Sequence, residues 1–413
     1  MPLTYQEAID FLFPRTTQIK FGLETTRRLL AAVGEPQRLF PTIHVAGTNG
    51  KGSVATLIAD TLQASGWKVG LYTSPHLVSF RERIRVNGVP ISEAAVASWT
   101  GHLQPRIEET GATFFEISTA IALADFAARE VDIAVIEVGL GGRLDSTNVI
   151  VPLASVITHI ALDHQKYLGD STRDIAREKA GIAKPGVPLV IGEPEQELVT
   201  TLLEAGKAAV TAHDPTGSFL PLIVPPGATF SGPLGLSGSH QRRNAAIASA
   251  LLEILPAPFR PRPEVQAVAF ARARVAGRLD RRGRWLFDVA HNPDGMRALT
   301  AALREMAPRR PIRALVSILG DKAYPEMLVE LDQAIDIGIL TVAPTATGRR
   351  WDTGWLERWL AEPGRPPARA KWRLEPDFWR ALREVESGQG TILVTGSFHT
   401  VGDVMTAKGF EVG

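Results

Sequence analysis

The stretch I-H-V-A-G-T-N-G-K-G-S, which runs from Ile43 to Ser53, decides the fold. A short apolar run leads into Gly47, Gly50 and Gly52, and Lys51 stands between the last two glycines. A helix is predicted directly after this loop, because apolar residues recur at the spacing of one helix face, at Val54, Leu57, Ile58 and Leu62. Glycines let backbone N–H groups approach a phosphate, and a helix N-terminus favours negative charge. The stretch therefore predicts a phosphate-binding site.

The loop departs from the standard phosphate-loop pattern G-x-x-x-x-G-K-[ST]. The first glycine of that pattern falls on Val45, and Gly52 separates Lys51 from Ser53. The alternative is a glycine-rich turn without a ligand, since Asn-Gly turns are common. We favour phosphate binding because an apolar strand precedes the loop and a helix follows the lysine. Ser53 is placed to reach a Mg²⁺ ion that binds the same phosphates.

The composition is that of a globular protein of enzyme size, and we expect no nucleic-acid or membrane partner. A chain of 413 residues is too long for one ordinary core, so two or three domains are expected. The net charge of +1 gives no electrostatic reason to bind nucleic acid or an anionic membrane. The absence of cysteine rules out disulfides, thiolate metal ligands and a cysteine nucleophile. We see neither a signal peptide nor an apolar run of membrane-spanning length, and expect a cytoplasmic protein.

Strands alternate with helices through the first part of the chain, and the strands are near-continuous apolar runs. This pattern is typical of a parallel sheet that helices cover on both faces. Asn87-Gly88 predicts a hairpin within 81–91, and Ser92 is expected to cap a helix that Gly111 ends. Further strands are predicted at 69–72, 133–138, 154–160 and 187–191, and further helices at 117–129 and from 171 or 172 to 183.

A domain boundary is expected near Arg278 to Arg284, in an arginine-rich segment. The alternation of strands and helices then restarts, with strands predicted at 285–290, 313–318, 339–342 and 391–395. Asn292 is expected to cap a helix that has Pro293 in its first turn. The second domain is therefore another α/β unit, and its sequence contains no phosphate loop.

Glu137 lies near the end of the apolar strand I-A-V-I-E-V, where an unpaired carboxylate would be costly. The carboxyl ends of strands beside a phosphate loop are where α/β sheets bind ligands, and a carboxylate there commonly holds Mg²⁺. A salt-bridged structural glutamate is the alternative. His164 follows the next strand, and beside such a metal site a ligand and a loop histidine are equally plausible.

Lys179 shares one helix face with Ile175 and Ile182. A lysine on an apolar stripe must extend its amine to water, pair with a carboxylate or change its charge state. A carbamylated lysine, which is anionic, would be the chemically interesting case.

Glu116 could be a pocket carboxylate or a helix N-terminal charge. Asp288 and His291 stand at a strand-to-helix corner, where polar side chains can reach a ligand.

The chain resembles folylpolyglutamate synthases and dihydrofolate synthases of the Mur ligase superfamily along nearly its whole length. The phosphate loop alone would be shared with all Mur-type ligases, whereas L-G-G-R-L-D-S-T-N (140–148) and R-E-K-A-G-I (177–182) are more specific. The other matching blocks include K-F-G-L-E (20–24), T-S-P-H-L (73–77), H-Q-R-R-N-A-A (240–246) and D-V-A-H-N-P-D-G (288–295).

The resemblance implies an α/β fold with an N-terminal ATP-binding domain on a mostly parallel sheet (1–277). A smaller, Rossmann-like glutamate ligase domain would follow (284–413), with the site between the two. It also implies that ATP phosphorylates a carboxylate of dihydropteroate or a folate to an acyl phosphate. The amine of L-glutamate would then attack, giving an amide, ADP and phosphate. Because an acyl phosphate hydrolyses in water, we expect a site that can close. We expect a monomer.

The resemblance also assigns residues to roles. Thr48, Asn49, Gly50, Lys51, Gly52 and Ser53 would bind the nucleotide, with Asn244, Arg278, Asp288 and His291. Ser74, Glu137 and His164 match metal ligands for Mg²⁺, of which two ions are expected, and Lys179 matches a carbamylated lysine. The acceptor would contact Ile19, Lys20, Phe21, Thr113, Phe114, Phe115, Glu116 and Leu144. Lys51, Glu137, His164 and Lys179 are the expected catalytic set.

Two other functions fit the phosphate loop. The first is a regulatory ATPase or switch, in which hydrolysis drives a conformational change and no amide forms. The second is a cell-wall Mur-type ligase that joins amino acids to a nucleotide sugar, which the block at 140–148 disfavours.

Overall fold

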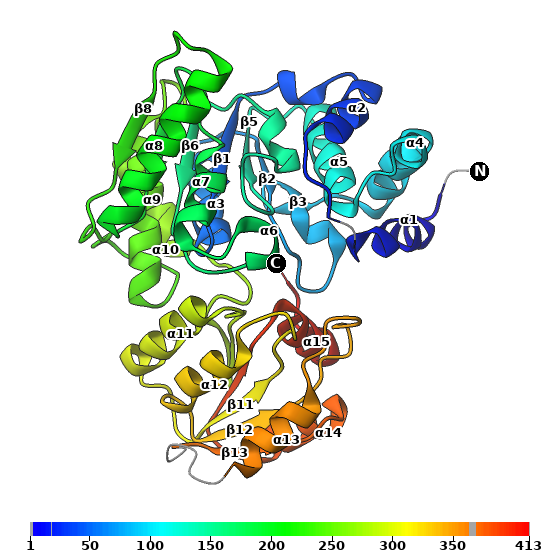
Figure 1. Cartoon of the computed structure of the whole chain (residues 1–413), viewed down its shortest axis with the longest axis vertical. Coiled ribbons are helices and arrows are strands. Elements are labelled where there is room, and N and C mark those ends of the chain that lie inside the picture. Colours follow the sequence, from blue (N-terminus) through cyan, green and yellow to red (C-terminus); the bar gives the residue numbers. More distant parts are fainter. Residues whose placement is uncertain (1–2, 18, 363–368, 413) are drawn as a thin grey trace. The chain divides into compact units, whose positions relative to one another are not determined.

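Two β-sheets organise the chain, one in each of two units (Figure 1). The structure is a computed structural model, and it describes residues 3–17, 19–362 and 369–412. Unit 1 comprises Met1–His76, Phe80–Leu234 and Arg242–Ala273. Unit 2 comprises Leu77–Ser79, Gly235–Gln241 and Arg274–Gly413.

The sheet of unit 1 has eight strands in the order β4-β3-β2-β5-β1-β6-β7-β8. All neighbouring pairs from β2 to β8 are parallel, whereas β3 and β4 form an antiparallel hairpin at one edge. The hairpin turns at Asn87-Gly88, as predicted, with φ of 48° and 76° at the two residues. The strands are β1 (Thr42–Ala46), β2 (Val69–Tyr72), β3 (Ile84–Val86), β4 (Val89–Pro90), β5 (Ile133–Glu137), β6 (Ala154–Ile157), β7 (Pro188–Ile191) and β8 (Leu220–Ile223).

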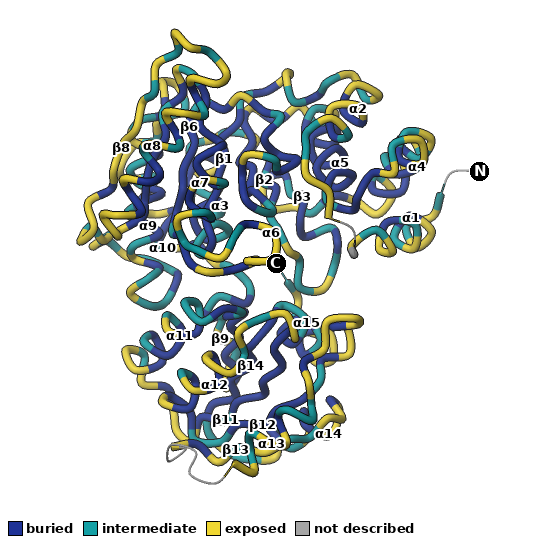
Figure 2. The backbone as a smooth tube through the Cα atoms, in the orientation of Figure 1, coloured by how far each residue is buried: buried dark blue, intermediate teal, exposed yellow. Residues whose placement is uncertain are grey.

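Helices pack against this sheet and bury its central strands (Figure 2). One apolar core joins α2, α4 and α5 to β2 and β5, and a second joins α7 and α8 to β6 and β7. The helices are α1 (Tyr5–Leu12), α2 (Glu24–Ala32), α3 (Lys51–Ala64), α4 (Glu93–Thr110), α5 (Phe114–Ala128), α6 (Gln165–Leu168), α7 (Thr172–Ala180), α8 (Gln196–His213), α9 (Ser239–Ile254) and α10 (Pro263–Arg272).

Three elements of unit 1 differ from the prediction. Helix α5 begins at Phe114 rather than Ile117, because Thr113 and Glu116 form a capping box at its N-terminus. Strand β6 ends at Ile157 rather than Ile160, because His159 pairs instead with Asn49 of the loop after β1. Helix α7 ends at Ala180 and not at Ala183.

The sheet of unit 2 has six strands in the order β13-β12-β11-β14-β10-β9, and only β9 is antiparallel to its neighbour. Asn292 caps α11 as predicted, since its Oδ1 accepts the Gly295 N–H at 2.7 Å. The strands are β9 (Asp280–Arg282), β10 (Trp285–Phe287), β11 (Ile312–Val316), β12 (Ile337–Leu340), β13 (Lys371–Leu374) and β14 (Thr391–Thr395). The helices are α11 (Pro293–Met306), α12 (Tyr324–Asp332), α13 (Thr353–Ala361), α14 (Phe378–Ser387) and α15 (Phe398–Lys408).

The predicted α/β class, with a mostly parallel sheet in each of the two units, is confirmed. The prediction missed β9, β13 and the helices α6, α8, α10 and α12 to α15. Among the helices of the described residues, none combines the length and the apolar character needed to cross a membrane.

Candidate active site

The loop after β1 and the first three residues of α3, which together we call the phosphate loop (residues 47–53), include two glycines with positive φ. Gly47 has φ of 147° and Gly50 has φ of 88°, both in regions that residues with a Cβ rarely adopt. A Cβ at either position would also clash with a neighbouring side chain. At Gly47 it would lie 1.9 Å from the Thr158 hydroxyl, and at Gly50 it would lie 2.6 Å from Asn244 Oδ1. The structure thus places Asn244 directly against the phosphate loop.

Lys51 is the first residue of α3, and its Nζ donates to the carbonyl of Thr48 at 3.1 Å. Among the described residues, no side chain caps the N-terminus of α3. The first N–H groups of a helix have no acceptor within the helix, so an anion suits them. Ser53, in the first turn, is buried.

Glu137, at the end of β5, lies beside this helix N-terminus. Its Oε2 accepts the Ser74 N–H at 3.2 Å, and the same oxygen is 3.6 Å from the point where a Cβ on Gly52 would lie. The side chain is only 3% exposed. The structure therefore brings together a buried carboxylate, Ser74 and the phosphate loop; the strand position of Glu137 predicted its place, and the family resemblance implied that of Ser74.

Lys179 reaches the phosphate loop from α7. Its Nζ donates to the carbonyl of Gly47 at 2.8 Å, and the side chain is buried. Burial, with a smaller contribution from the Lys51 charge, lowers the pKa of Lys179 to about 7, while Asp163 and Asp145 act in the opposite direction. At neutral pH much of this amine is therefore uncharged, which is the form that can react as a nucleophile.

His164 stands at the N-terminus of α6 with a left-handed φ of 52°. Its backbone N–H donates to Asp163 Oδ1 at 2.8 Å, and its side chain is 37% exposed. The described ranges contain no group of three or more His, Cys, Asp or Glu side chains that could hold a metal ion. A metal at this site would thus need hydroxyl or ligand oxygens in addition to Glu137.

The expected acceptor residues lie on three neighbouring segments of unit 1. Phe21 is half exposed and its ring contacts Tyr167, while the backbone N–H of Gly22 reaches the Leu144 carbonyl at 3.5 Å. Lys20 donates to the carbonyl of Gly111, and the ring of Phe115 lies where a Cβ on Gly139 would be. The remaining members are Ile19, which is exposed, and Thr113, Phe114 and Glu116, which are buried at the start of α5.

The carboxylate of Glu116 has a structural role. Its Oε2 accepts the N–H of Thr113 at 2.8 Å and the hydroxyl of Thr113 at 2.7 Å. Of the two interpretations that the sequence left open for Glu116, the helix N-terminal charge accounts for these contacts.

Unit 2 groups Arg278, Asp288 and His291. The Asp288 carboxylate accepts the N–H groups of Leu279 at 3.0 Å and Ala290 at 2.9 Å. Burial raises its pKa, and Arg278 opposes that shift. The Arg278 guanidinium and the His291 ring both lie against Phe398, at 5.3 and 5.6 Å from its centroid.

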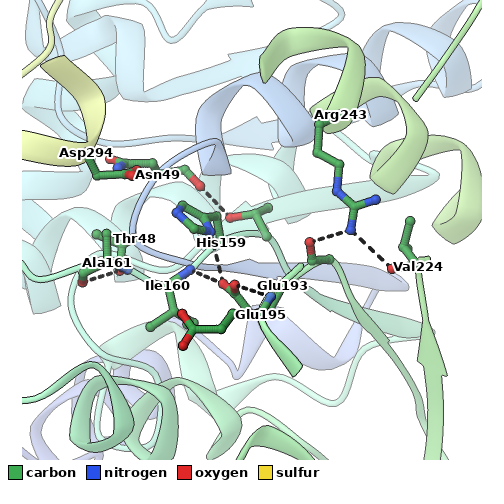
Figure 3. Close-up of polar contacts among 12 residues, drawn as sticks. Thr48, Asn49, His159, Ile160, Ala161, Glu193, Glu195, Val224, Arg243 and Asp294 are labelled. Carbon is green, nitrogen blue, oxygen red and sulfur yellow. Dashed lines mark hydrogen bonds and ion pairs between the residues drawn. The ribbon is translucent and has the colours of Figure 1, made fainter. Parts of the chain in front are cut away.

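The sequence analysis missed the polar residues that form hydrogen bonds with the backbone of the phosphate loop. Thr158 donates its hydroxyl to the Asn49 carbonyl at 2.7 Å, and the carbonyl of His159 accepts the Thr48 N–H at 2.6 Å (Figure 3). Glu193 in turn contacts His159 and Ile160. Glu193 comes two residues after the buried strand β7, and Glu137 is the last residue of β5, so an acidic residue at the carboxyl end of an apolar strand was a usable signal in both cases.

A strand, a glycine loop and a helix with a lysine in its first turn, at the carboxyl ends of the strands of a parallel sheet, define a phosphate-loop α/β protein. Two family models match the chain: the Mur ligase middle domain over residues 45–207, and the Mur ligase glutamate ligase domain over residues 272–398.

Known relatives extend this match to the whole chain. A dihydrofolate synthase/folylpolyglutamate synthase of Bacillus subtilis is 33% identical, over 97% of this chain and 98% of the relative. The structure is similar to Mycobacterium tuberculosis folylpolyglutamate synthase complexed with ADP, with a TM-score of 0.85, 30% identity and 99% of each chain covered. It is also similar to the bifunctional Yersinia pestis enzyme complexed with AMPPNP and a Mn ion, with a TM-score of 0.82, 28% identity, and 99% and 98% coverage. The chain belongs to the folylpolyglutamate synthase/dihydrofolate synthase family of the Mur ligase superfamily, and it is a ligase enzyme.

Proposed function

We propose that this enzyme uses ATP to join L-glutamate to dihydropteroate, to a reduced folate, or to both, with release of ADP and phosphate. The observation that carries the proposal is the group of side chains around the phosphate loop. Lys51, Glu137 and Lys179 all lie within a few ångströms of its backbone. The similar proteins named above are synthases of this kind, and solved relatives are complexed with ADP or AMPPNP.

The nucleotide would bind on the phosphate loop. Its phosphates would accept the N–H groups of residues 50–53 at the start of α3, and Lys51 would neutralise part of their charge. Asn244 lies against Gly50 and would contact the nucleotide from α9. Arg278, Asp288 and His291 are proposed as further nucleotide contacts, as are Thr48 and Asn49.

The residues beside the loop fit a hard divalent cation. A buried carboxylate at Glu137 and hydroxyls at Ser53 and Ser74 are oxygen donors of the kind that Mg²⁺ prefers. We propose these residues and His164 as the ligands of Mg²⁺, with two ions in the full site. When bound, the metal would neutralise negative charge on the transferred phosphoryl group.

Lys179 is proposed to be carbamylated. Its lowered pKa provides the neutral amine, whose nitrogen attacks the carbon of carbon dioxide and then releases a proton to solvent. The product is an anionic carbamate beside the phosphate loop. An anion there can interact with cations in the site, which a protonated lysine cannot do.

The reaction would take place in two steps. A carboxylate oxygen of the acceptor attacks the terminal phosphorus of ATP, and ADP leaves with the electrons of the broken P–O bond. The amine of L-glutamate then attacks the carbonyl carbon of the acyl phosphate, and phosphate and a proton leave as the amide forms. The aromatic and apolar residues Ile19, Phe21, Phe114, Phe115 and Leu144, with Lys20 and Thr113, are proposed to bind the acceptor.

The test is an assay with ATP, Mg²⁺, L-glutamate and each acceptor in turn, followed by mass measurement of the product. We expect a product that is heavier by one glutamyl residue, with ADP formed only when acceptor and glutamate are both present. ADP formation at full rate with neither of them would instead favour the regulatory ATPase. Ligation only with a nucleotide-sugar acceptor would favour the cell-wall ligase.

The finer organisation is proposed from the family pattern. Residues 1–277 would form the ATP-binding domain and residues 284–413 the glutamate ligase domain, and the boundary near 278–284 stays a prediction. We propose a monomer that acts in the cytoplasm. Light scattering at micromolar concentration would check the monomer.

A further inference from the structure

We infer that Glu193 is a positioning residue for the phosphate loop, which it shapes through the backbone of residues 158–161 without touching a substrate. The inference rests on the proposed function in one respect, namely that the phosphate loop binds ATP. The proposed reaction gives Glu193 no chemical role. Glu193 follows β7, and β1 and β6 separate β7 from β5, which carries Glu137.

The Glu193 carboxylate is buried and is occupied by hydrogen-bond donors (Figure 3). Its Oε2 accepts the N–H of Ile160 at 2.7 Å and lies 3.0 Å from His159 Nδ1, while its Oε1 accepts the N–H of Glu195 at 3.0 Å. The side chain is 1% exposed. A buried carboxylate is costly unless donors satisfy it, so Glu193 strongly favours the conformation of 159–160 that supplies them.

The segment that Glu193 holds is in direct contact with the phosphate loop. The His159 carbonyl accepts the Thr48 N–H at 2.6 Å. Thr48 and Ala161 exchange two further hydrogen bonds, because the Thr48 hydroxyl donates to the Ala161 carbonyl at 3.2 Å and accepts the Ala161 N–H at 3.1 Å. The Thr158 hydroxyl donates to the Asn49 carbonyl at 2.7 Å. Thr48 and Asn49 are thus aligned by residues 158–161.

A second side chain fixes the backbone from which Glu193 projects. Arg243 donates to the carbonyls of Gly192 at 2.9 Å and Val224 at 3.1 Å (Figure 3). The residue after Arg243 is Asn244, whose side chain lies against Gly50. Two sets of contacts therefore reach the phosphate loop. Glu193 acts on Thr48 and Asn49 through residues 158–161, and Gly192 is hydrogen-bonded to Arg243, whose neighbour Asn244 lies against Gly50.

The test compares Glu193→Gln with the matched control Glu195→Gln. Glutamine at 193 removes the charge and keeps only one acceptor oxygen, because an NH2 donor replaces the other oxygen. Either the Glu195 N–H, or the Ile160 N–H together with His159, therefore faces a donor instead of an acceptor. Glu195 is exposed, and it contributes only its backbone N–H to the cluster. The probe is AMPPNP with Mg²⁺, and its Kd is measured by calorimetry. The KM values for ATP, acceptor and glutamate are measured as well.

For Glu193→Gln we expect the Kd of AMPPNP and the KM for ATP to rise by roughly tenfold or more, because small displacements of positioned groups cost about that much. The KM values for acceptor and glutamate should change by less than about twofold, and Glu195→Gln should bind like the wild type. This split between substrates separates positioning of the loop from a general loss of structure. Hydrogen exchange of the Thr48 amide should accelerate in the same variant.

An unchanged Kd for AMPPNP in folded Glu193→Gln would overturn the inference, and so would equal increases in all three KM values. Where Glu193→Gln does not fold, Glu193→Asp, which keeps the charge but shortens the side chain, is judged by the same comparison. If the wild type ligates neither acceptor but Glu193→Gln still weakens AMPPNP binding, the proposed function fails and the role of Glu193 stands.

Discussion

At the scale of single residues, Lys179 separates what a sequence can predict from what it cannot. Its position on an apolar helix face left three outcomes open, namely an amine that extends to water, a carboxylate partner or a changed charge state, and the burial of the side chain excludes the first. Its acceptor is the Gly47 carbonyl, 132 residues away in the chain, and no local pattern predicts such a contact. The lowered pKa follows from that tertiary environment, since burial is its largest cause.

The carbamate at Lys179 can be tested with Lys179→Arg, because the arginine carries a positive charge and cannot be carbamylated. We expect this variant to fold and to lose ligase activity by roughly 100-fold or more, because an anion in the site is replaced by a cation. Product formation under saturating substrates measures the loss. Intact-protein mass spectrometry under carbon dioxide should detect the adduct in the wild type alone. Normal Mg²⁺-dependent activity in Lys179→Arg would remove the carbamate from the mechanism.

Asp60 in α3 provides a test of stability against pH. Burial raises the pKa of this carboxyl to about 6, although Arg85 acts in the opposite direction. Between the unfolded value near 4 and about 6, the folded state binds more protons, so stability falls as the pH rises through this range. Asp60→Asn should therefore have a higher free energy of unfolding than the wild type at pH 7.5, by at most ~3 kcal/mol, as measured by urea unfolding. This difference should shrink toward pH 4.5. A difference that does not vary with pH would contradict the assigned shift.

At the scale of elements, the elements predicted correctly are those with a local signal. The Asn87-Gly88 hairpin and the Asn292 cap each depend on a few adjacent residues. Strands β9 and β13 were missed because both are edge strands with charged residues in place of an apolar run. Their sequences are D-R-R and K-W-R-L. An edge strand has one hydrogen-bonded neighbour and faces solvent, so it needs no continuous apolar run.

The start of α5 allows the two roles of Glu116 to be distinguished. Because its carboxylate belongs to a capping box, Glu116→Gln should keep one acceptor for the Thr113 N–H and lose less than about 1 kcal/mol. Thr113→Ala removes the cap hydroxyl and should cost about 1 kcal/mol. Urea unfolding measures both values. We also expect the acceptor KM of Glu116→Gln to remain within about twofold of the wild type, and a tenfold increase would return Glu116 to the substrate-binding set.

At the scale of the whole molecule, the family and the class of the fold could be predicted because motifs recur along nearly the entire chain. The support of the phosphate loop could not, because it depends on which strands become neighbours. Strand β1 lies between β5 and β6, and this order brings Glu137 to one side of the loop and His159 to the other. Strand order is a property of the folded sheet, and the hydrophobic periodicity of the sequence does not predict it.

Nucleotide binding should stabilise the whole chain, and Lys51 should be required for this effect. A ligand that binds only the folded state adds about 2.7 kcal/mol at 100 times its Kd. With AMPPNP and Mg²⁺ the wild type should therefore melt at a higher temperature, and amides of residues 47–53 should gain hydrogen-exchange protection.

Lys51→Ala removes the cation of the phosphate loop and should abolish most of this stabilisation while the ligand-free melting temperature remains close to that of the wild type. Lys68→Ala is the matched control, because Lys68 is an exposed lysine that follows the same helix. It should retain the full stabilisation by nucleotide. If Lys51→Ala and Lys68→Ala gain equally from AMPPNP, the nucleotide binds elsewhere, and the assignment of the phosphate loop is wrong.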